Sequence, residues 1–291
     1  MGTLDKIIVA IDNSKISEEV LKRALLLANK NGSIIVIVHI INTPLFEAPD
    51  YFGGDKTQKI DQDEIKSQIE NKIATLNNNP NIKCLVLVDS GDISDKIIHE
   101  AKQIDGQMII LGAHSTEELT TKKVGTTAKK IIQDSHLPII IVKNPANKIY
   151  NNILAPTDLS DFSKKSILFT KNILKDGNIK LVYIYEEPVD KYIDYYNLSQ
   201  EDKLVLDKKT ESYIKADLKK FKENVGIETS DFIKCEITLE NDLVNHIKNH
   251  KNDLVIIGSH GVKNIESFLF GSTAAFLMAE SSSDILVYVP E

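Results

Sequence analysis

Cysteine, net positive charge and long apolar runs are all scarce in this sequence, and each scarcity excludes a class of protein. Two cysteines among 291 residues, Cys84 and Cys235, cannot make a disulfide framework or a cysteine-based metal site. A net charge of −7 argues against a general nucleic-acid or membrane-surface binder. No stretch approaches the roughly 20 apolar residues of a membrane span, and the early run Ile7 to Ile11 is too short for a signal peptide. We therefore expect a cytoplasmic protein without nucleic-acid or membrane partners.

The chain repeats itself. Several landmark residues recur at a constant offset of 146 positions: Asp12 and Asp158, Gly112 and Gly258, His114 and His260, Gly125 and Gly271. Both cysteines close the tripeptide IKC, so we expect them at equivalent mid-strand positions, as buried small hydrophobes. The constant offset indicates a tandem duplication, with domains at residues 1–146 and 147–291 and a joint near residues 144–150.

Short apolar runs alternate with helical patterns in each copy. The expected strands of the first copy are residues 6–11, 33–41, 82–88, 108–111 and 139–142; in the second copy, residues 180–185 and 232–239 are the second and third strands. Continuously apolar strands that alternate with helices predict an α/β fold, with a parallel sheet covered on both faces. In such sheets ligands bind at the carboxyl ends of the strands, where the winding direction reverses. Asp158 and Gly258 end two strands that are expected to flank that point.

The stretch from Asp253 to Pro290 carries the clearest binding signal. A buried strand ends at Gly258, Gly261 follows in a loop, and Gly271 leads Ser272 and Thr273 into an apolar helix. Glycines let backbone amides approach a ligand closely, and a helix N-terminus offers unpaired N–H groups to an anion. This pattern predicts a phosphate cradle.

This glycine spacing, Gly258-x2-Gly261-x9-Gly271-Ser272, follows Pro156-Thr157-Asp158, and together they closely resemble the universal stress protein family in its ATP-binding branch. The resemblance covers nearly the whole chain as two tandem copies. It implies two five-stranded αβ sandwiches of strand order 3-2-1-4-5, the adenine nucleotide alpha hydrolase-like fold. It also implies a stress-response regulatory protein that binds ATP or AMP, with Mg²⁺ as an optional companion.

The same resemblance assigns roles to particular residues. Asp158 would contact the adenine, in a slot lined by Pro156, Thr157 and Ile184. The loop glycines Gly258 and Gly261 would cover the ribose and phosphates. The residues that would hold the phosphates at the helix start are Gly271, Ser272 and Thr273.

The first copy departs from this pattern. Ser115 stands where the second loop glycine belongs, and Asp12 follows alanine and isoleucine rather than proline and threonine. A serine carries a steric cost where close backbone approach is needed, although Lys122 and Lys123 could attract an anion. We expect one nucleotide site per chain, in the second domain.

Several of these residues also have simpler structural interpretations. The three glycines could be ordinary turn residues, and Asp158 could cap the following helix. His246 and His250 have the spacing of metal ligands, but no glutamate signature accompanies them, so a solvated helix face is expected. The five tyrosines between Tyr183 and Tyr196 fit either the packing of a long loop or a partner surface.

Two other functions compete with nucleotide binding. An ATPase or nucleotidyl transferase on the same fold is disfavoured, because the chain has no GK[ST], SGG or HIGH element and no recognisable catalytic base or nucleophile beside the phosphates. A nucleotide-free interaction scaffold fits the first copy but not the second. By family resemblance, residues 139–142 would pair with residues 285–289 in an internal pseudo-dimer, and whole chains could form a homodimer.

Overall fold

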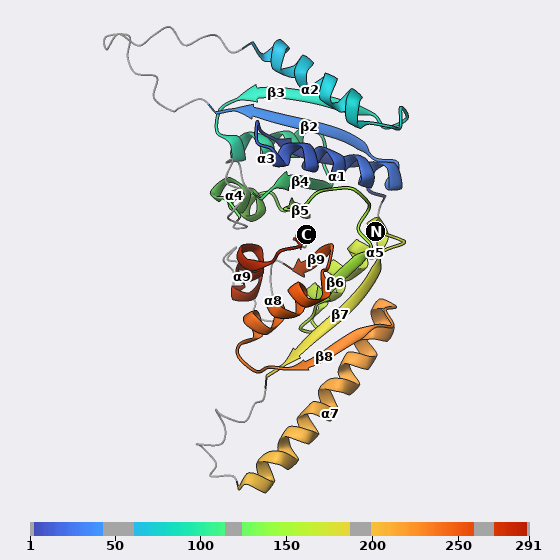
Figure 1. Cartoon of the computed structure of the whole chain (residues 1–291), viewed down its shortest axis with the longest axis vertical. Helices are drawn as coiled ribbons and strands as arrows, with labels where there is room; N and C mark the ends of the chain where they lie inside the picture. The colour runs from blue at the N-terminus through green and yellow to red at the C-terminus, as the bar shows by residue number, and fades with distance from the viewer. Residues whose placement is uncertain (1–2, 43–60, 114–123, 187–198, 259–270, 290–291) are drawn as a thin grey trace, which may run out of the picture. The chain divides into compact units, whose positions relative to one another are not determined.

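The computed structural model describes residues 3–42, 61–113, 124–186, 199–258 and 271–289 (Figure 1). These residues belong to two compact units, Met1–Ile149 and Tyr150–Pro290. Each unit contains five parallel strands and its own covering helices. The predicted pairing between residues 139–142 and 285–289 concerns the relation of the two units and stays a prediction.

The first unit has five parallel strands in the order β3-β2-β1-β4-β5. Its strands are β1 (Lys6–Ile11), β2 (Ile34–Ile41), β3 (Cys84–Ser90), β4 (Met108–Gly112) and β5 (Ile139–Val142). Its helices are α1 (Ile16–Asn31), α2 (Gln62–Leu76), α3 (Ile93–Gln103) and α4 (Thr126–Asp134).

The second unit repeats this arrangement, with parallel strands in the order β8-β7-β6-β9-β10. Its strands are β6 (Asn152–Pro156), β7 (Asn178–Tyr185), β8 (Ser230–Lys234), β9 (Leu254–Gly258) and β10 (Asp284–Tyr288). Its helices are α5 (Asp161–Ile173), α7 (Gln200–Val225), α8 (Leu239–His250) and α9 (Ser272–Glu280). In each unit the strands therefore run 3-2-1-4-5, and the predicted fold is confirmed.

The direction of the crossovers places helices on both faces of each sheet. In the first unit the chain moves outward from β1 to β2 through α1, and moves back from β3 to β4 through α3. Parallel crossovers are almost always right-handed, so these two helices lie on opposite faces. The strands between them are buried on both sides, which is why they are continuously apolar: Ile7, Ile8 and Val9 are each 0 % exposed.

Local residue chemistry sets several helix ends. Gly32 adopts φ 73° after α1 and donates its N–H to the Ala28 carbonyl at 2.8 Å, as expected for a glycine that ends a helix. Gly226 ends α7 in the same left-handed conformation, with φ 63°. The carboxylate of Asp61 caps α2 by accepting the N–H groups of Asp63 and Glu64.

Two expectations about the third strands are wrong. The predicted third strand of the second unit extends too far toward its carboxyl end, and Cys84 and Cys235 do not occupy equivalent strand positions. β8 ends at Lys234, because the Asp242 carboxylate accepts the N–H groups of Glu236 and Ile237 at 2.7 and 3.2 Å and holds a turn there. Cys84 is the first residue of β3, whereas Cys235 lies just beyond the end of β8. Burial raises the pKa of Cys84, and burial with the neighbouring Asp242 raises that of Cys235 to about 11, so both thiols stay protonated at neutral pH.

Candidate functional site

Five of the predicted site residues lie at or near the carboxyl ends of neighbouring strands in the second unit. β6 lies between β7 and β9, and ends at Pro156, with Thr157 and Asp158 directly after it. Ile184 lies near the end of β7, and Gly258 is the last residue of β9. The strand order thus brings these residues to one edge of the sheet, where its winding direction reverses. Gly261 lies outside the described residues.

The turn after β6 holds Asp158 firmly. The Thr157 N–H donates to the Val182 carbonyl at 3.0 Å, so the sheet continues one residue past β6. Asp158 Oδ1 accepts the Ser160 N–H at 3.0 Å and the Ser163 hydroxyl at 2.6 Å. Within the described part of the chain, the second oxygen, Oδ2, accepts no hydrogen bond, and the side chain is exposed. Asp158 therefore supports the start of α5 and retains a carboxylate oxygen for a ligand.

Backbone strain follows this aspartate. Leu159 has φ 63°, in the left-handed region that non-glycine residues rarely adopt, and its N–H donates to the Thr157 hydroxyl at 3.0 Å. Such strain costs about 1–3 kcal/mol and concentrates at ligand sites. In the first unit Asp12 makes the matching contacts with the Ser14 N–H and the Ser17 hydroxyl, at 2.9 and 2.7 Å. Both aspartates therefore hold the start of the following helix. Only in the second copy of this turn does the residue after the aspartate adopt a left-handed conformation.

Gly271 is the N-cap of α9, and neither its backbone conformation nor its packing against the described residues requires a glycine. Its φ of −55° and ψ of 148° are open to any residue. A Cβ built on it would meet no heavy atom within 4 Å among the residues that the structure describes. The fold of the described residues therefore does not explain this glycine, and none of those residues fills the space beside it.

Glu240 is a site residue that the sequence reasoning missed. It lies in the first turn of α8, and its Oε1 accepts the hydroxyls of Ser272 and Thr273, both at 3.3 Å. A carboxylate is favoured at the positive end of a helix, so Glu240 supplies the negative charge that the start of α9 attracts. The only sequence signal was an acidic first turn in α8, which does not reveal its neighbour 32 residues away.

Tyr183 lies close to the predicted base-binding end of the sheet. Burial raises the pKa of Tyr183, with smaller contributions from the charges of Asp158 and Glu186. Its ring stacks on the Phe232 ring, with centroids 5.8 Å apart and an 8° interplanar angle. The Tyr185 ring also stacks on Phe232, with a centroid distance of 5.7 Å. These two tyrosines therefore pack within the unit. Tyr192, Tyr195 and Tyr196 lie outside the described residues.

At the corresponding helix start of the first unit, one backbone N–H group is hydrogen-bonded within the protein. The N–H of Gly125, the N-cap of α4, donates to the Ala113 carbonyl at 2.9 Å. A Cβ on Gly125 would lie 3.6 Å from the same carbonyl oxygen, an ordinary contact. One amide at this helix start is therefore already used by the protein. Ser115, Lys122 and Lys123 lie outside the described residues.

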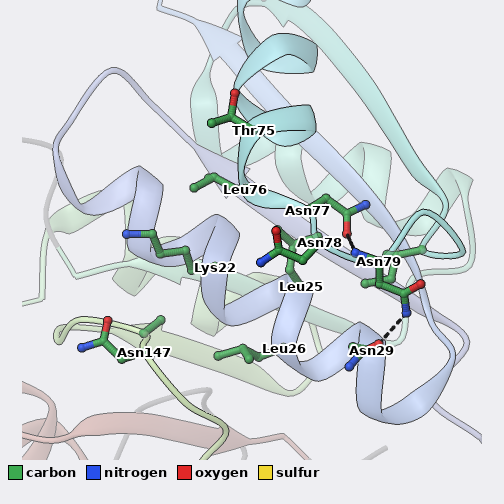
Figure 2. A pocket seen from close by; sticks show the side chains of 12 residues that line it. Lys22, Leu25, Leu26, Asn29, Thr75, Leu76, Asn77, Asn78, Asn79 and Asn147 are labelled. Carbon is green, nitrogen blue, oxygen red and sulfur yellow. Dashed lines mark hydrogen bonds between the residues drawn. The ribbon is translucent and has the colours of Figure 1, made fainter.

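A surface pocket of the first unit lies elsewhere. It has a volume of about 370 Å³ and is lined by α1, the end of α2 and the segment around Ala146 (Figure 2). Asn79 organises its rim by donating to Asn29 Oδ1 at 2.6 Å and to Asn77 Oδ1 at 3.0 Å. These asparagines precede β2 and β3, so the pocket lies at the amino-terminal edge of the first unit's sheet, opposite to the carboxyl edge where ligands bind in such sheets.

The expectation of a solvated helix face is wrong for His246. Its side chain is only 9 % exposed, since α8 packs it toward Asp231 of β8, whereas His250 is exposed as expected. Burial lowers the pKa of His246, and the neighbouring His250 and Lys180 lower it further against the opposing effect of Asp231. The imidazole is therefore neutral at pH 7.

Known proteins resemble this chain over one copy or over both. Universal stress protein MJ0577 of Methanocaldococcus jannaschii is 26% identical over 155 residues, which cover 48% of this chain and 94% of that protein. The crystal structure of a universal stress protein from Archaeoglobus fulgidus covers 98% of both chains, at 18% identity and a TM-score of 0.67. Another structure from Archaeoglobus fulgidus is a universal stress protein in complex with dAMP; it covers 49% of this chain and all of its own, at 20% identity and a TM-score of 0.36.

Among the described helices, none is long and apolar enough to span a membrane.

The model of the universal stress protein family matches the sequence twice, over residues 3–143 and 149–289. These two matches cover nearly the whole chain, and each coincides with one set of five parallel strands in the order 3-2-1-4-5. The chain therefore belongs to the universal stress protein family.

Proposed function

We propose that the protein is a cytoplasmic stress-response regulator that binds one adenine nucleotide, ATP or AMP, in its second unit. The observation that carries this proposal is Gly271: a glycine at the start of a nine-residue helix, in an ordinary backbone conformation, where an added Cβ would meet no heavy atom of the described residues within 4 Å. Close approach of a phosphate to the backbone is the physical use of such a glycine. Membership of the universal stress protein family supports an adenine nucleotide as the ligand.

The described residues suit the separate parts of a nucleotide. Asp158 Oδ2 is available to accept a hydrogen bond from the adenine amine or a ribose hydroxyl. Ile184 and Thr157 are 9 % exposed and provide a partly apolar wall beside it, together with Pro156. Gly258 and Gly261 would cover the ribose and phosphates, and Gly271, Ser272 and Thr273 would receive the phosphates, with Mg²⁺ as an optional companion.

Titration of the full chain with ATP and with AMP tests the proposal. We expect one nucleotide per chain, and at least about tenfold weaker binding by Asp158→Asn, because a hydrogen bond to a charged group contributes about 1.5–3 kcal/mol. Asparagine keeps an oxygen for Ser160 and Ser163, so α5 should start normally. The matched control is Asp12→Asn in the first unit. Two nucleotides per chain, or equal losses in both variants, would contradict a site confined to the second unit.

In this proposal, Glu240 weakens the binding of the nucleotide phosphates. Its carboxylate accepts the hydroxyls of Ser272 and Thr273, the groups that would receive a phosphate. An incoming phosphate meets the negative charge of Glu240 and competes for the same donors. Glu240→Gln is therefore expected to tighten nucleotide binding by roughly three- to tenfold, from the 0.3–1 kcal/mol typical of a charge at a helix end plus the relieved repulsion.

Isothermal titration at low and moderate salt would measure this gain, which should shrink as salt screens the repulsion. Glu201→Gln provides a matched control, because Glu201 is likewise an acid in the first turn of a helix. Unchanged or weaker nucleotide binding by Glu240→Gln would show that the carboxylate does not oppose the phosphate.

Glu240 also favours a second candidate function, slow ATP hydrolysis. It is a carboxylate beside the proposed phosphate position, and such a group can orient or deprotonate a water molecule. Multiple-turnover phosphate release would distinguish this enzyme from a binding protein, and hydrolysis by this route would be lost in Glu240→Gln although the nucleotide binds more tightly.

A further inference from the structure

Three side chains with metal-binding atoms converge in the second unit, apart from the proposed nucleotide site. Asp231 of β8 and His246 and His250 of α8 each place one ligand atom within 4.8 Å of the other two. His246 Nε2 lies 3.1 Å from Asp231 Oδ2. The two histidines are four residues apart on one helix face, and their rings lie 4.0 Å apart between centroids. The sequence showed only this helical pair; the fold adds the carboxylate.

Two of these atoms are buried without a hydrogen bond. His246 Nε2 and Asp231 Oδ2 are shielded from solvent, and within the described residues neither makes a hydrogen bond of acceptable geometry. The His246 side chain is 9 % exposed. Buried polar atoms are nearly always satisfied by protein, water or an ion. The two atoms face each other at 3.1 Å, and the other charged group at this carboxylate is Lys180 Nζ, 2.7 Å from Asp231 Oδ2. A metal ion bound by both atoms would give each of them a well-aligned partner.

His250 is oriented as a metal ligand would be. Its Nδ1 lies 2.9 Å from the His246 carbonyl oxygen. A carbonyl can only accept, so Nδ1 is the protonated nitrogen of the neutral ring, and in that tautomer Nε2 has the lone pair. Metal-binding histidines commonly use their second nitrogen in this way, which fixes the tautomer and the ring orientation.

From this geometry we propose that Asp231, His246 and His250 bind a divalent transition metal ion, with Zn²⁺ as the ion that suits them best. Two imidazoles and one carboxylate match the nitrogen and oxygen preferences of Zn²⁺, whereas Mg²⁺ and Ca²⁺ prefer oxygen ligands alone. Three protein ligands leave a coordination position for water. The ion would tie β8 to α8.

Lys180 is the competing cation at this site. Its Nζ lies 2.7 Å from Asp231 Oδ2, and its side chain is 37% exposed. Binding of the metal ion displaces this ammonium group, which can turn toward solvent. The charge of Lys180 therefore weakens metal binding without preventing it, and its removal should strengthen it.

The site is confined to the second unit and lies away from the proposed nucleotide position. At the offset of 146 residues, the first unit has Glu100 and Ile104 in place of the two histidines. Within α8, His250 lies ten residues after Glu240, about 15 Å along the helix axis. Metal binding and nucleotide binding are therefore independent proposals.

Zinc titration of the full chain, first treated with a chelator, tests the site by calorimetry. We expect one Zn²⁺ per chain. His250→Ala should weaken binding by more than about 100-fold, beyond the roughly 10- to 100-fold that loss of an outer-shell partner costs. Asp231→Asn should weaken it similarly, whereas Lys180→Gln should tighten it. Because His250 is exposed, its replacement should leave the fold intact, as circular dichroism would check.

His99→Ala is the matched control, since His99 is an exposed histidine on α3 of the first unit. It should bind zinc as the unmodified chain does. A second readout is the thermal midpoint, which zinc should raise in the unmodified chain and in His99→Ala but not in His250→Ala. Equal zinc affinity in the unmodified chain, His250→Ala and Asp231→Asn would overturn the proposal, as would the absence of zinc binding.

Discussion

Gly271→Val is expected to weaken adenine-nucleotide binding by roughly 100-fold, because charge-assisted hydrogen bonds to phosphate contribute about 1.5–3 kcal/mol each and the new side chain blocks them. A Cβ at position 271 meets no heavy atom within 4 Å among the described residues, so in the proposal the added side chain takes the space of the phosphate. The N-cap change itself should cost no more than about 1 kcal/mol of stability. Calorimetric nucleotide titration and urea unfolding measure the two effects separately.

The duplication supplies the control for this experiment. Gly125 is the N-cap of α4 in the first unit, 146 residues earlier, and a Cβ there makes only an ordinary 3.6 Å contact. Gly125→Val should therefore leave nucleotide binding unchanged. Nucleotide affinity that survives in Gly271→Val, or that falls equally in both variants, would remove the main support for a site in the second unit.

Tyr150→Phe is expected to lower the free energy of unfolding of the second unit by about 2 kcal/mol, the typical contribution of a hydrogen bond to a charged group. The Tyr150 hydroxyl donates to Asp284 Oδ2 at 2.6 Å, and the two residues are 1 % and 0 % exposed. Phenylalanine keeps the ring in place and removes only the donor, so a buried carboxylate loses a partner that water cannot replace. Urea unfolding followed by circular dichroism measures the change.

Tyr213→Phe makes the same chemical change on the surface. Tyr213 is 69% exposed on α7, so its hydroxyl is already hydrated and its loss should change stability by less than about 0.5 kcal/mol. Equal unfolding midpoints for Tyr150→Phe and Tyr213→Phe would mean that the buried hydrogen bond contributes nothing measurable.

Much of the fold could be predicted because it depends on local patterns. The repeat offset, the continuously apolar strands and the helix-ending glycines such as Gly32 all act through nearby residues or through a period along the chain. The boundary of β8 could not be predicted in this way. An apolar alternation continues past Lys234, and only the Asp242 side chain, reaching back to the amides of Glu236 and Ile237, ends the strand.

Some features of the candidate site could be predicted from the sequence, and others only from the tertiary structure. The sequence alone determined the α/β class, the duplication and the strand-end positions of Asp158 and Gly258, because these follow from apolar periods, glycines and hydroxyl residues along the chain. The strand order came from the resemblance to the universal stress protein family. Only the tertiary structure decided which polar side chains of different elements meet: Glu240 accepts the hydroxyls at the start of α9, and Asp231 lies beside His246. These contacts join side chains of different elements, and their distances depend on how helix and sheet pack rather than on any spacing along the chain.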